Sequence, residues 1–239
     1  MIIIPARLAS SRLPNKVLAD IGGLPMVVKT AKAVEEIDSV VIATDSQEVV
    51  DAVKNHGLEA VLTSESCKSG TDRIYEAAQK LQLNDDEIII NVQADEPFIE
   101  QDVVQQMVDI TKENVENFDV IATSCYKIID AHTAQNPNIV KVVTNLGGRA
   151  LYFSRSLVPY CRNQELNEYK AHLGLYGFTM KKLEAFCSMD AGVLEDIEKL
   201  EQLRILDNGY QIALAEVESS SFGIDTKEDL DRALRKHIL

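Results

Sequence analysis

Short runs of β-branched residues alternate with helical patterns over the first half of the chain, and this rhythm limits the possible folds more than any other feature. Apolar runs at residues 2–4, 39–43, 59–62, 87–92 and 119–125 predict strands. Helical spacing of apolar residues marks residues 25–36, 47–55, 72–81 and 101–113. Strands that alternate with helices in this way predict an α/β fold with a mostly parallel, doubly wound sheet in three layers.

The pattern becomes richer in strands in the middle third of the chain. Residues 138–144 and 149–153, on either side of a Gly-Gly turn, predict an antiparallel pair, and residues 173–180 predict a further extended segment. Helices over 182–188, 195–206 and 227–236 and a strand over 211–217 complete the chain. We therefore expect a single domain over residues 1–239, with a β-rich region at about residues 125–180.

Composition excludes several classes of protein. With 24 basic and 38 acidic residues, the chain has a formal net charge of −14, which argues against a nucleic-acid partner. No apolar run reaches the roughly 18 residues that a membrane span needs, and the N-terminus lacks a signal-peptide pattern. The four cysteines form no C-x-x-C pair. We expect a cytoplasmic protein with free thiols and no membrane partner.

The segment after the first predicted strand is basic, although the protein as a whole is acidic. Pro5 cannot donate a ladder hydrogen bond and ends the strand, and no acidic residue precedes Asp20. Arg7, Arg12 and Lys16 follow Pro5, and a loop at the carboxyl end of a strand is where α/β sheets bind ligands. Guanidinium, ammonium and hydroxyl groups suit a polyphosphate, although a solvated basic loop would carry the same charges.

Two aspartates are candidates for binding a metal ion. Asp95 directly follows the strand at 87–92, and Asp225 lies between the last strand and the last helix. Each could be a helix cap, but carboxylates beside a cationic phosphate loop suit Mg²⁺, which combines few carboxylates with phosphate oxygens. The sequence contains no G-x-G-x-x-G, G-x-x-x-x-G-K-[ST], G-x-S-x-G or H-E-x-x-H motif, which argues against the enzyme classes that use them.

Eleven short segments, in order along the full chain, resemble the 3-deoxy-manno-octulosonate cytidylyltransferase family. They are residues 4–16, 43–45, 69–73, 91–97, 136–138, 140–143, 150–155, 172–174, 175–177, 200–204 and 223–226. The resemblance implies a fold like that of nucleotide-diphospho-sugar transferases. It also implies an enzyme of lipopolysaccharide biosynthesis that joins 3-deoxy-manno-octulosonate (Kdo), an acidic eight-carbon sugar, to CMP from CTP, with release of diphosphate.

The resemblance further implies Mg²⁺ dependence, a homodimer formed through the β-rich region, and roles for matching residues. The implied catalytic residues are Lys16, Arg7, Asp95 and Asp225. Of these, Asp95 and Asp225 are implied to bind the metal ion. The implied CTP ligands are Arg7, Ser10, Arg12, Lys16, Ser69, Gly70, Thr71 and Arg73. The implied sugar ligands are Gln93, Arg155, His172, Tyr176, Glu201 and Gln202.

Without the resemblance, some of these residues have simpler interpretations. His172 could be a satisfied core histidine, and Tyr176 could be strand core. Glu201 and Gln202 could lie on the solvated face of the helix predicted over 195–206. On the same helix, Glu195 and Glu198 are expected to be surface charges.

The chain departs from the family pattern at three positions. Ala94 stands where the family has glycine beside the metal ligand, and Asn15 replaces a glycine of the phosphate loop, where asparagine tolerates a left-handed backbone. Ala171 replaces an arginine that often precedes the histidine, which removes a cation near the sugar. A related acid sugar, 8-amino-Kdo or a sialic acid, therefore stays open as the substrate. A non-catalytic nucleotide-binding protein is the alternative from another class.

Overall fold

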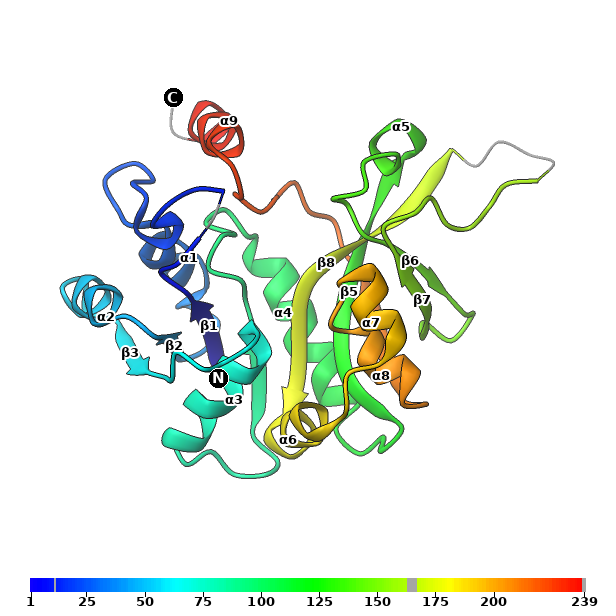
Figure 1. Ribbon diagram of the computed structural model, residues 1–239, viewed down its shortest axis with the longest axis horizontal. Helices are drawn as coiled ribbons and strands as arrows, with labels where there is room; N and C mark the ends of the chain where they lie inside the picture. The colour runs from blue at the N-terminus through cyan, green and yellow to red at the C-terminus, as the bar shows by residue number, and fades with distance from the viewer. Residues whose placement is uncertain (11, 163–166, 238–239) are drawn as a thin grey trace. The chain divides into compact units, whose positions relative to one another are not determined.

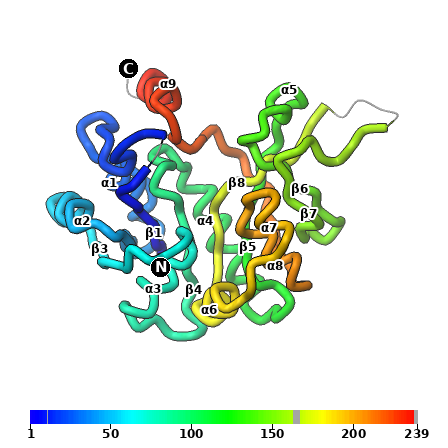
Figure 2. The backbone as a smooth tube through the Cα atoms, viewed as in Figure 1, coloured from blue at the N-terminus to red at the C-terminus, as the bar shows by residue number. Residues whose placement is uncertain are grey.

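The structure is a computed structural model that describes residues 1–10, 12–162 and 167–237 (Figure 1). The chain forms two compact units. Unit 1 consists of Met1–Gln105 together with Ser219–Leu239, and unit 2 consists of Gln106–Glu218. The helix α4 (Gln101–Glu113) carries the boundary between them. Figure 2 follows the chain out of unit 1 and back into it, where the red segment ends in α9 (Lys227–His237).

Unit 1 is built on four parallel strands, as the sequence predicts. They are β1 (Ile2–Ala6), β2 (Val40–Thr44), β3 (Glu59–Leu62) and β4 (Ile88–Asn91), in the order β3-β2-β1-β4. β1 lies between two neighbours and is buried along its whole length, which explains the uninterrupted isoleucine run.

The helices of unit 1 determine where its ligands can bind. α1 (Met26–Val34) and α2 (Gln47–Lys54) connect strands that progress in one direction, from β1 to β3. α3 (Gly70–Lys80) leads back past β2 and β1 to β4, so right-handed crossovers place it on the opposite face of the sheet. The strand order thus reverses between β1 and β4, and ligands of such sheets bind at the carboxyl ends of the strands at that point.

The C-terminal segment is attached to unit 1 by apolar and polar contacts. Ile224 is fully buried in a cluster with Ile21, Met26 and Ala233. The Glu100 carboxylate accepts hydrogen bonds from the Ser219 hydroxyl and the Ser220 amide, both at 2.8 Å. These contacts bring Asp225 into the same unit as the first strand.

Unit 2 contains the longest strands. β5 (Val120–Asp130) pairs with β8 (Glu168–Thr179) in antiparallel fashion and with β9 (Gln211–Glu216) in parallel. The predicted antiparallel pair is confirmed as β6 (Lys141–Thr144) and β7 (Ala150–Ser154). Four helices complete the described part of the unit: α5 (Ala131–Ala134), α6 (Met180–Ser188), α7 (Val193–Glu198) and α8 (Leu203–Asp207). Residues 163–166, within the predicted β-rich region, lie outside the described residues.

A close contact inside unit 2 depends on a glycine. The hydroxyls of Thr111 and Thr123 are 2.6 Å apart, and both lie against the Cα of Gly177 on β8. A methyl group at Gly177 would overlap both hydroxyls, so only glycine fits at this point of the strand.

One helix and the bounds of two strands differ from the predictions in unit 2. The helix predicted over 195–206 is interrupted at Lys199, whose φ of 53° is left-handed, so α7 and α8 are separate. The turn buries both Leu200 and Gln202, which a continuous helix would point in opposite directions. β5 and β8 also extend beyond the predicted ends, because they pair with each other as far as Asp130 and Glu168.

The fold class predicted from the sequence is confirmed. The chain is an α/β protein with parallel strands in unit 1 and a mixed arrangement with a β6–β7 hairpin in unit 2. Within the described ranges, no helix combines the length and the hydrophobicity that crossing a bilayer requires.

Candidate functional site

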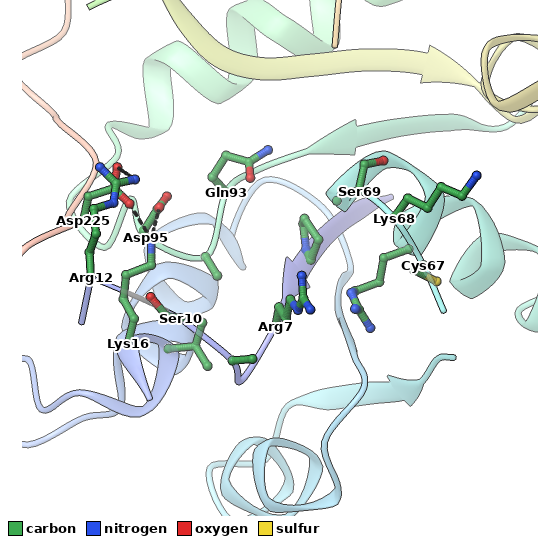
Figure 3. Close-up of a pocket in the computed structure, with 16 residues that line it drawn as sticks. Arg7, Ser10, Arg12, Lys16, Cys67, Lys68, Ser69, Gln93, Asp95 and Asp225 are labelled. Carbon is green, nitrogen blue, oxygen red and sulfur yellow. Dashed lines mark hydrogen bonds and ion pairs between the residues drawn. The ribbon is translucent and has the colours of Figure 1, made fainter. Parts of the chain in front are cut away.

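A pocket of about 350 Å³ lies in unit 1 at the carboxyl ends of β1 and β4. It is lined by the loop after β1, the start of α3, the loop after β4 and Asp225. The lining residues are Pro5, Arg7, Ala9, Ser10, Arg12, Lys16, Val17, Cys67, Lys68, Ser69, Gly70, Arg73, Gln93, Ala94, Asp95 and Asp225. Figure 3 shows Arg12, Lys16, Asp95 and Asp225 together at one end, Cys67, Lys68 and Ser69 at the other, and Arg7 between them. This is the position that the strand order predicts for a ligand.

The loop after β1 turns sharply before Lys16. Asn15 adopts a left-handed backbone with φ 51° and ψ 34°, and its carbonyl accepts the Leu18 amide at 2.9 Å. A short 3₁₀ helix, Lys16–Leu18, follows directly. The prediction that asparagine can replace glycine in this turn is confirmed, because asparagine tolerates the left-handed region better than most residues.

Lys16 joins the two aspartates that the sequence singles out. Its Nζ donates to Oδ2 of Asp95 at 2.6 Å and to Oδ1 of Asp225 at 2.9 Å. Arg12 Nη2 lies 2.9 Å from the other oxygen of Asp225, Oδ2. Residues from three distant parts of the chain thus form one ionic cluster, which we call the Lys16 cluster (Arg12, Lys16, Asp95 and Asp225).

The Lys16 cluster shifts the protonation equilibria of its members. Burial acts to lower the pKa of Lys16, but the charges and hydrogen bonds of Asp95 and Asp225 outweigh it, and the pKa lies above its ordinary value. Burial acts to raise the pKa of Asp225, but Lys16 and Arg12 outweigh it, and the pKa lies below its ordinary value. Lys16 is therefore an ammonium and Asp225 a carboxylate at neutral pH.

Backbone contacts fix the two carboxylates. The Ile224 amide donates to the Asp95 carbonyl at 2.9 Å. This hydrogen bond joins the residue before Asp225 to the backbone of Asp95. The Thr30 hydroxyl of α1 donates to the Ala94 carbonyl at 2.9 Å. Ala94 itself is buried, so the methyl group that replaces the family's glycine is accommodated.

The start of α3 forms the opposite wall of the pocket. Ser69 and Asp72 form a capping box, in which the Ser69 hydroxyl accepts the Asp72 amide at 3.1 Å and the Ser69 amide donates to the Asp72 carboxylate at 3.2 Å. A Cβ at Gly70 would lie 3.4 Å from the Pro5 ring, so glycine allows the helix to approach β1 closely. Thr71 is buried and does not line the pocket.

Arg73 reaches the pocket but is bound inside the protein. Its side chain is only 3% exposed, its Nη2 lies 2.8 Å from Asp45 Oδ2, and its Nη1 donates to the Thr63 hydroxyl at 2.7 Å. The sequence resemblance implies contact with the nucleotide. The structure shows that Arg73 also joins α3 to the ends of β2 and β3.

Sequence reasoning missed Cys67 and Lys68, which line the pocket beside the capped helix. Cys67 Sγ donates to Glu76 Oε2 at 3.2 Å, and the same carboxylate accepts the Ser64 amide at 2.9 Å. Burial, together with Glu76, raises the pKa of the Cys67 thiol to about 11, so it is not a nucleophile at neutral pH. The available signal for Lys68 was a basic residue in the loop shortly before the helix predicted over 72–81.

The predicted sugar ligands lie in both units. Gln93 lines the pocket of unit 1, and its side chain donates to the Asn91 side chain at 3.2 Å. In unit 2, His172 and Tyr176 lie four residues apart on β8, with ring centroids 5.5 Å apart. Glu201 and Gln202 lie in the turn between α7 and α8, not on a helix face.

His172 is held as a neutral ring. Its Nε2 lies 2.8 Å from the Ser124 hydroxyl, and burial lowers the pKa of its imidazole to about 3. Burial, with the charge of Glu201, raises the pKa of the Tyr176 hydroxyl. Both side chains can therefore offer neutral hydrogen-bonding groups at neutral pH.

The expectation that Glu195 and Glu198 are surface charges is wrong. Glu198 accepts the Ser154 hydroxyl at 2.6 Å and the Arg155 amide at 3.0 Å, and its own carbonyl accepts Arg155 Nε at 2.9 Å. Glu195 forms two hydrogen bonds with Arg204, at 2.7 and 2.8 Å. The α7 helix therefore positions Arg155, which lies 43 residues from Glu198, too far along the chain for a helical pattern to reveal the contact.

Within the described residues, no group of three or more histidine, cysteine or acidic side chains is arranged to hold a metal ion. Asp95 and Asp225 nevertheless approach one nitrogen, that of Lys16. Two carboxylates beside an open, cationic pocket match Mg²⁺, which keeps water and phosphate oxygens as its other ligands. The donor set therefore fits a nucleotide-bound metal.

Comparison with known proteins agrees with this geometry. Residues 1–214 match the family described as cytidylyltransferase. The chain is 51% identical over 232 residues to a 3-deoxy-manno-octulosonate cytidylyltransferase from a Nitratiruptor species, and the match covers 97% of each chain. It is 48% identical over 239 residues to the Wolinella succinogenes protein of the same name, and that match covers 98% of each chain.

A solved structure supports the same grouping. The structure of CMP:2-keto-3-deoxy-manno-octonic acid synthetase in complex with CTP superposes with a TM-score of 0.90 at 37% identity. The match covers 100% of this chain and 98% of that one. The chain thus belongs to the 3-deoxy-manno-octulosonate cytidylyltransferase family.

Proposed function

We propose that this protein joins Kdo to CMP, consuming CTP and releasing diphosphate, and so activates the sugar for lipopolysaccharide biosynthesis. The observation that carries the proposal is the Lys16 cluster, which lies in a cationic pocket at the reversal point of the sheet. Nucleotidyl transfer needs positive charge around a phosphate, and the family membership supplies the identity of the nucleotide and the sugar.

The basic loop is proposed to hold the triphosphate. Arg7, Arg12 and Lys16 supply cationic donors and Ser10 a hydroxyl, and all four line the pocket. Ser69, Gly70, Thr71 and Arg73 are proposed to lie against the nucleoside. Of these four, Ser69 and Gly70 lie at the start of α3. The Arg73 side chain forms an ion pair with Asp45.

Asp95 and Asp225 are proposed to bind Mg²⁺. When bound, Mg²⁺ neutralises phosphate charge and acidifies the attacking hydroxyl of the sugar. Lys16 is then available to stabilise the negative charge that develops on the α-phosphate. Arg7, which is exposed in the same pocket, is proposed to share that role.

The residues proposed to bind the sugar are those that the sequence resemblance implies: Gln93, Arg155, His172, Tyr176, Glu201 and Gln202. Kdo carries a carboxylate, which suits a guanidinium, and several hydroxyls, which suit amide, carboxylate and neutral imidazole groups. The neutral state of His172 agrees with hydrogen bonding to a hydroxyl.

Both units are proposed to serve one nucleotidyltransferase, which acts as a homodimer through the region at about residues 125–180. Large apolar side chains are exposed there among the described residues: Ile128, Leu146, Leu151, Leu157 and Tyr160. Burial of such a patch against a second copy would remove apolar surface from water. Sedimentation of the wild type and of Leu151→Lys tests this, and a monomeric wild type would contradict it.

Diphosphate release tests the proposed reaction. CTP and Mg²⁺ are supplied with Kdo, 8-amino-Kdo or a sialic acid in parallel, and release is expected with Kdo. Asp95→Asn should abolish turnover, whereas the matched control Asp85→Asn, an exposed acid outside the pocket, should not. Silence with all three sugars, despite thermal stabilisation by CTP, would favour a non-catalytic nucleotide-binding protein.

A related acid sugar is the second candidate, and Ala171 favours 8-amino-Kdo among such sugars. The side chain at this position is buried and precedes His172, so no arginine cation is present there. A kcat/KM for 8-amino-Kdo or sialic acid above that for Kdo would identify this specialised substrate.

A further inference from the structure

The carboxylates proposed for Mg²⁺ are already bound by cations of the protein. Lys16 Nζ bridges one oxygen of Asp95 and one of Asp225, and Arg12 pairs with the second oxygen of Asp225 (Figure 3). The Lys16 side chain is 15% exposed and that of Asp95 is 25% exposed, so this ion pair is partly shielded from water. A divalent cation that binds both aspartates must displace Lys16.

The partners differ in how easily they can move. The Asp95 and Asp225 segments are joined through the Ile224 amide and the Asp95 carbonyl, and the Asp225 amide donates to the Asp229 carboxylate at 3.3 Å. The backbone of Lys16 lies in the 3₁₀ turn, but its ammonium is at the end of a flexible four-carbon chain. Displacement therefore requires rotation of the lysine side chain and leaves the carboxylates in place.

We propose that Lys16 is an internal counterion that holds the divalent-cation position until CTP binds, so that metal and nucleotide bind cooperatively. A metal ion alone displaces the ammonium from two carboxylates and offers it no new counter-charge. The triphosphate offers one, because the same pocket contains both the phosphate loop and the two aspartates. This role of Lys16 rests on the metal and nucleotide sites proposed above.

Cooperativity of this kind has a definite thermodynamic form. The factor by which CTP raises the affinity for the metal must equal the factor by which the metal raises the affinity for CTP. Coupled sites commonly show factors of about 5–150, and we expect about tenfold or more here, because two short charged contacts must be exchanged. Removing Lys16 should remove most of the coupling by making the nucleotide-free site open to the metal.

Mn²⁺ binding to the full chain measures this directly. Mn²⁺ serves as the probe, and electron paramagnetic resonance reports the free ion with and without a non-hydrolysable α,β-methylene analogue of CTP. Lys16→Met should bind Mn²⁺ without nucleotide about tenfold more tightly than the wild type, and its dependence on the analogue should nearly vanish. Arg7→Met is the matched control, since it removes one positive charge from the same pocket at a residue outside the Lys16 cluster.

The control distinguishes displacement from a general effect of charge. If Arg7→Met strengthens Mn²⁺ binding as much as Lys16→Met does, or if neither variant strengthens it, the counterion role of Lys16 is overturned. Thermal unfolding monitored by circular dichroism confirms that the variants fold. Lys16→Gln, which keeps a hydrogen-bond donor but no charge, replaces Lys16→Met if the latter is unfolded, with the same expected result.

Asp95→Asn separates this inference from the metal site on which it rests. If Mn²⁺ binding in the presence of the analogue survives in Asp95→Asn, the proposed metal site is wrong and the role of Lys16 fails with it. If that binding is lost in Asp95→Asn but Lys16→Met behaves like the wild type, the metal site stands and only the role of Lys16 is overturned.

Discussion

Replacement of Asp45 by asparagine should destabilise unit 1 far more than neutralisation of an exposed acid. Asp45 lies at the end of β2, and its carboxylate is 2.8 Å from the guanidinium of Arg73. The two side chains are 12% and 3% exposed, so water can do little to replace the lost charge. Asp45→Asn leaves a buried guanidinium that still donates to the Thr63 hydroxyl but has lost its counter-charge.

The magnitude follows from this burial. Removing one partner of a buried ion pair typically costs about 3–5 kcal/mol, whereas an exposed pair contributes about 0–1 kcal/mol. Since globular proteins are stable by only about 5–15 kcal/mol, the buried-pair figure is a large share of the total. The matched control is Glu35→Gln, which breaks the exposed pair with Lys32 in the same unit and should cost under about 0.5 kcal/mol.

Urea unfolding followed by far-ultraviolet circular dichroism is the assay, because the chain has no tryptophan to report by fluorescence. Transitions of the two units are analysed separately if they do not coincide. A loss of less than about 1 kcal/mol in Asp45→Asn would refute the burial argument.

A double variant separates stability from nucleotide binding. Asp45→Leu with Arg73→Met replaces the buried pair by apolar side chains, which often restores stability. If Arg73 also contacts the nucleotide, the double variant should be stable and still show a raised KM for CTP. A normal KM would contradict the proposed contact.

Three further outcomes are expected. Gly177→Ala should lower stability by about 1–3 kcal/mol in urea unfolding, because its methyl group overlaps two threonine hydroxyls, and an unchanged midpoint would contradict this. Because the pKa of Asp225 is lowered and that of Lys16 is raised, stability should fall as pH drops below about 3.8 and again as it rises above about 10.5. Urea midpoints across pH should show both losses in the wild type and weaker ones in Lys16→Met. Glu76→Gln should raise the KM for CTP several-fold with a smaller effect on kcat. Glu76 holds the loop that carries Cys67 by hydrogen bonds to the Ser64 amide and the Cys67 thiol, each worth about 1 kcal/mol. Steady-state kinetics measure both constants, and an effect confined to kcat would contradict this.

Features set by local physical chemistry could be predicted from the sequence. The isoleucine run forms a buried strand because a parallel strand has neighbours on both sides and helices over both faces. Asn15 is predicted to keep a left-handed turn because the family that the sequence resembles has glycine there and asparagine tolerates that backbone, and the structure confirms it. The positions of the basic loop, Asp95 and Asp225 at one edge of the sheet follow from the crossover rule and from the resemblance together.

Features set by distant partners could not be predicted. The apolar spacing predicts one helix over 195–206, but a left-handed Lys199 interrupts it and lets Leu200 and Gln202 both be buried. Nothing in the sequence indicates that the Arg73 guanidinium forms a buried ion pair with Asp45, which lies 28 positions away. The contact between Glu198 and Arg155 is hidden from the sequence pattern for the same reason, because the two residues are 43 positions apart.

The separation of Lys16 from Asp225 has a consequence for synthesis on the ribosome. The two residues are 209 positions apart, and all of unit 2 is translated between the two segments of unit 1. At about 5–20 residues per second, that interval lasts on the order of ten seconds. During that interval Lys16 and Asp95 have both been made, but Asp225, the second carboxylate of the Lys16 cluster, has not. The Lys16 cluster can therefore be completed only after the chain for unit 2 has been made.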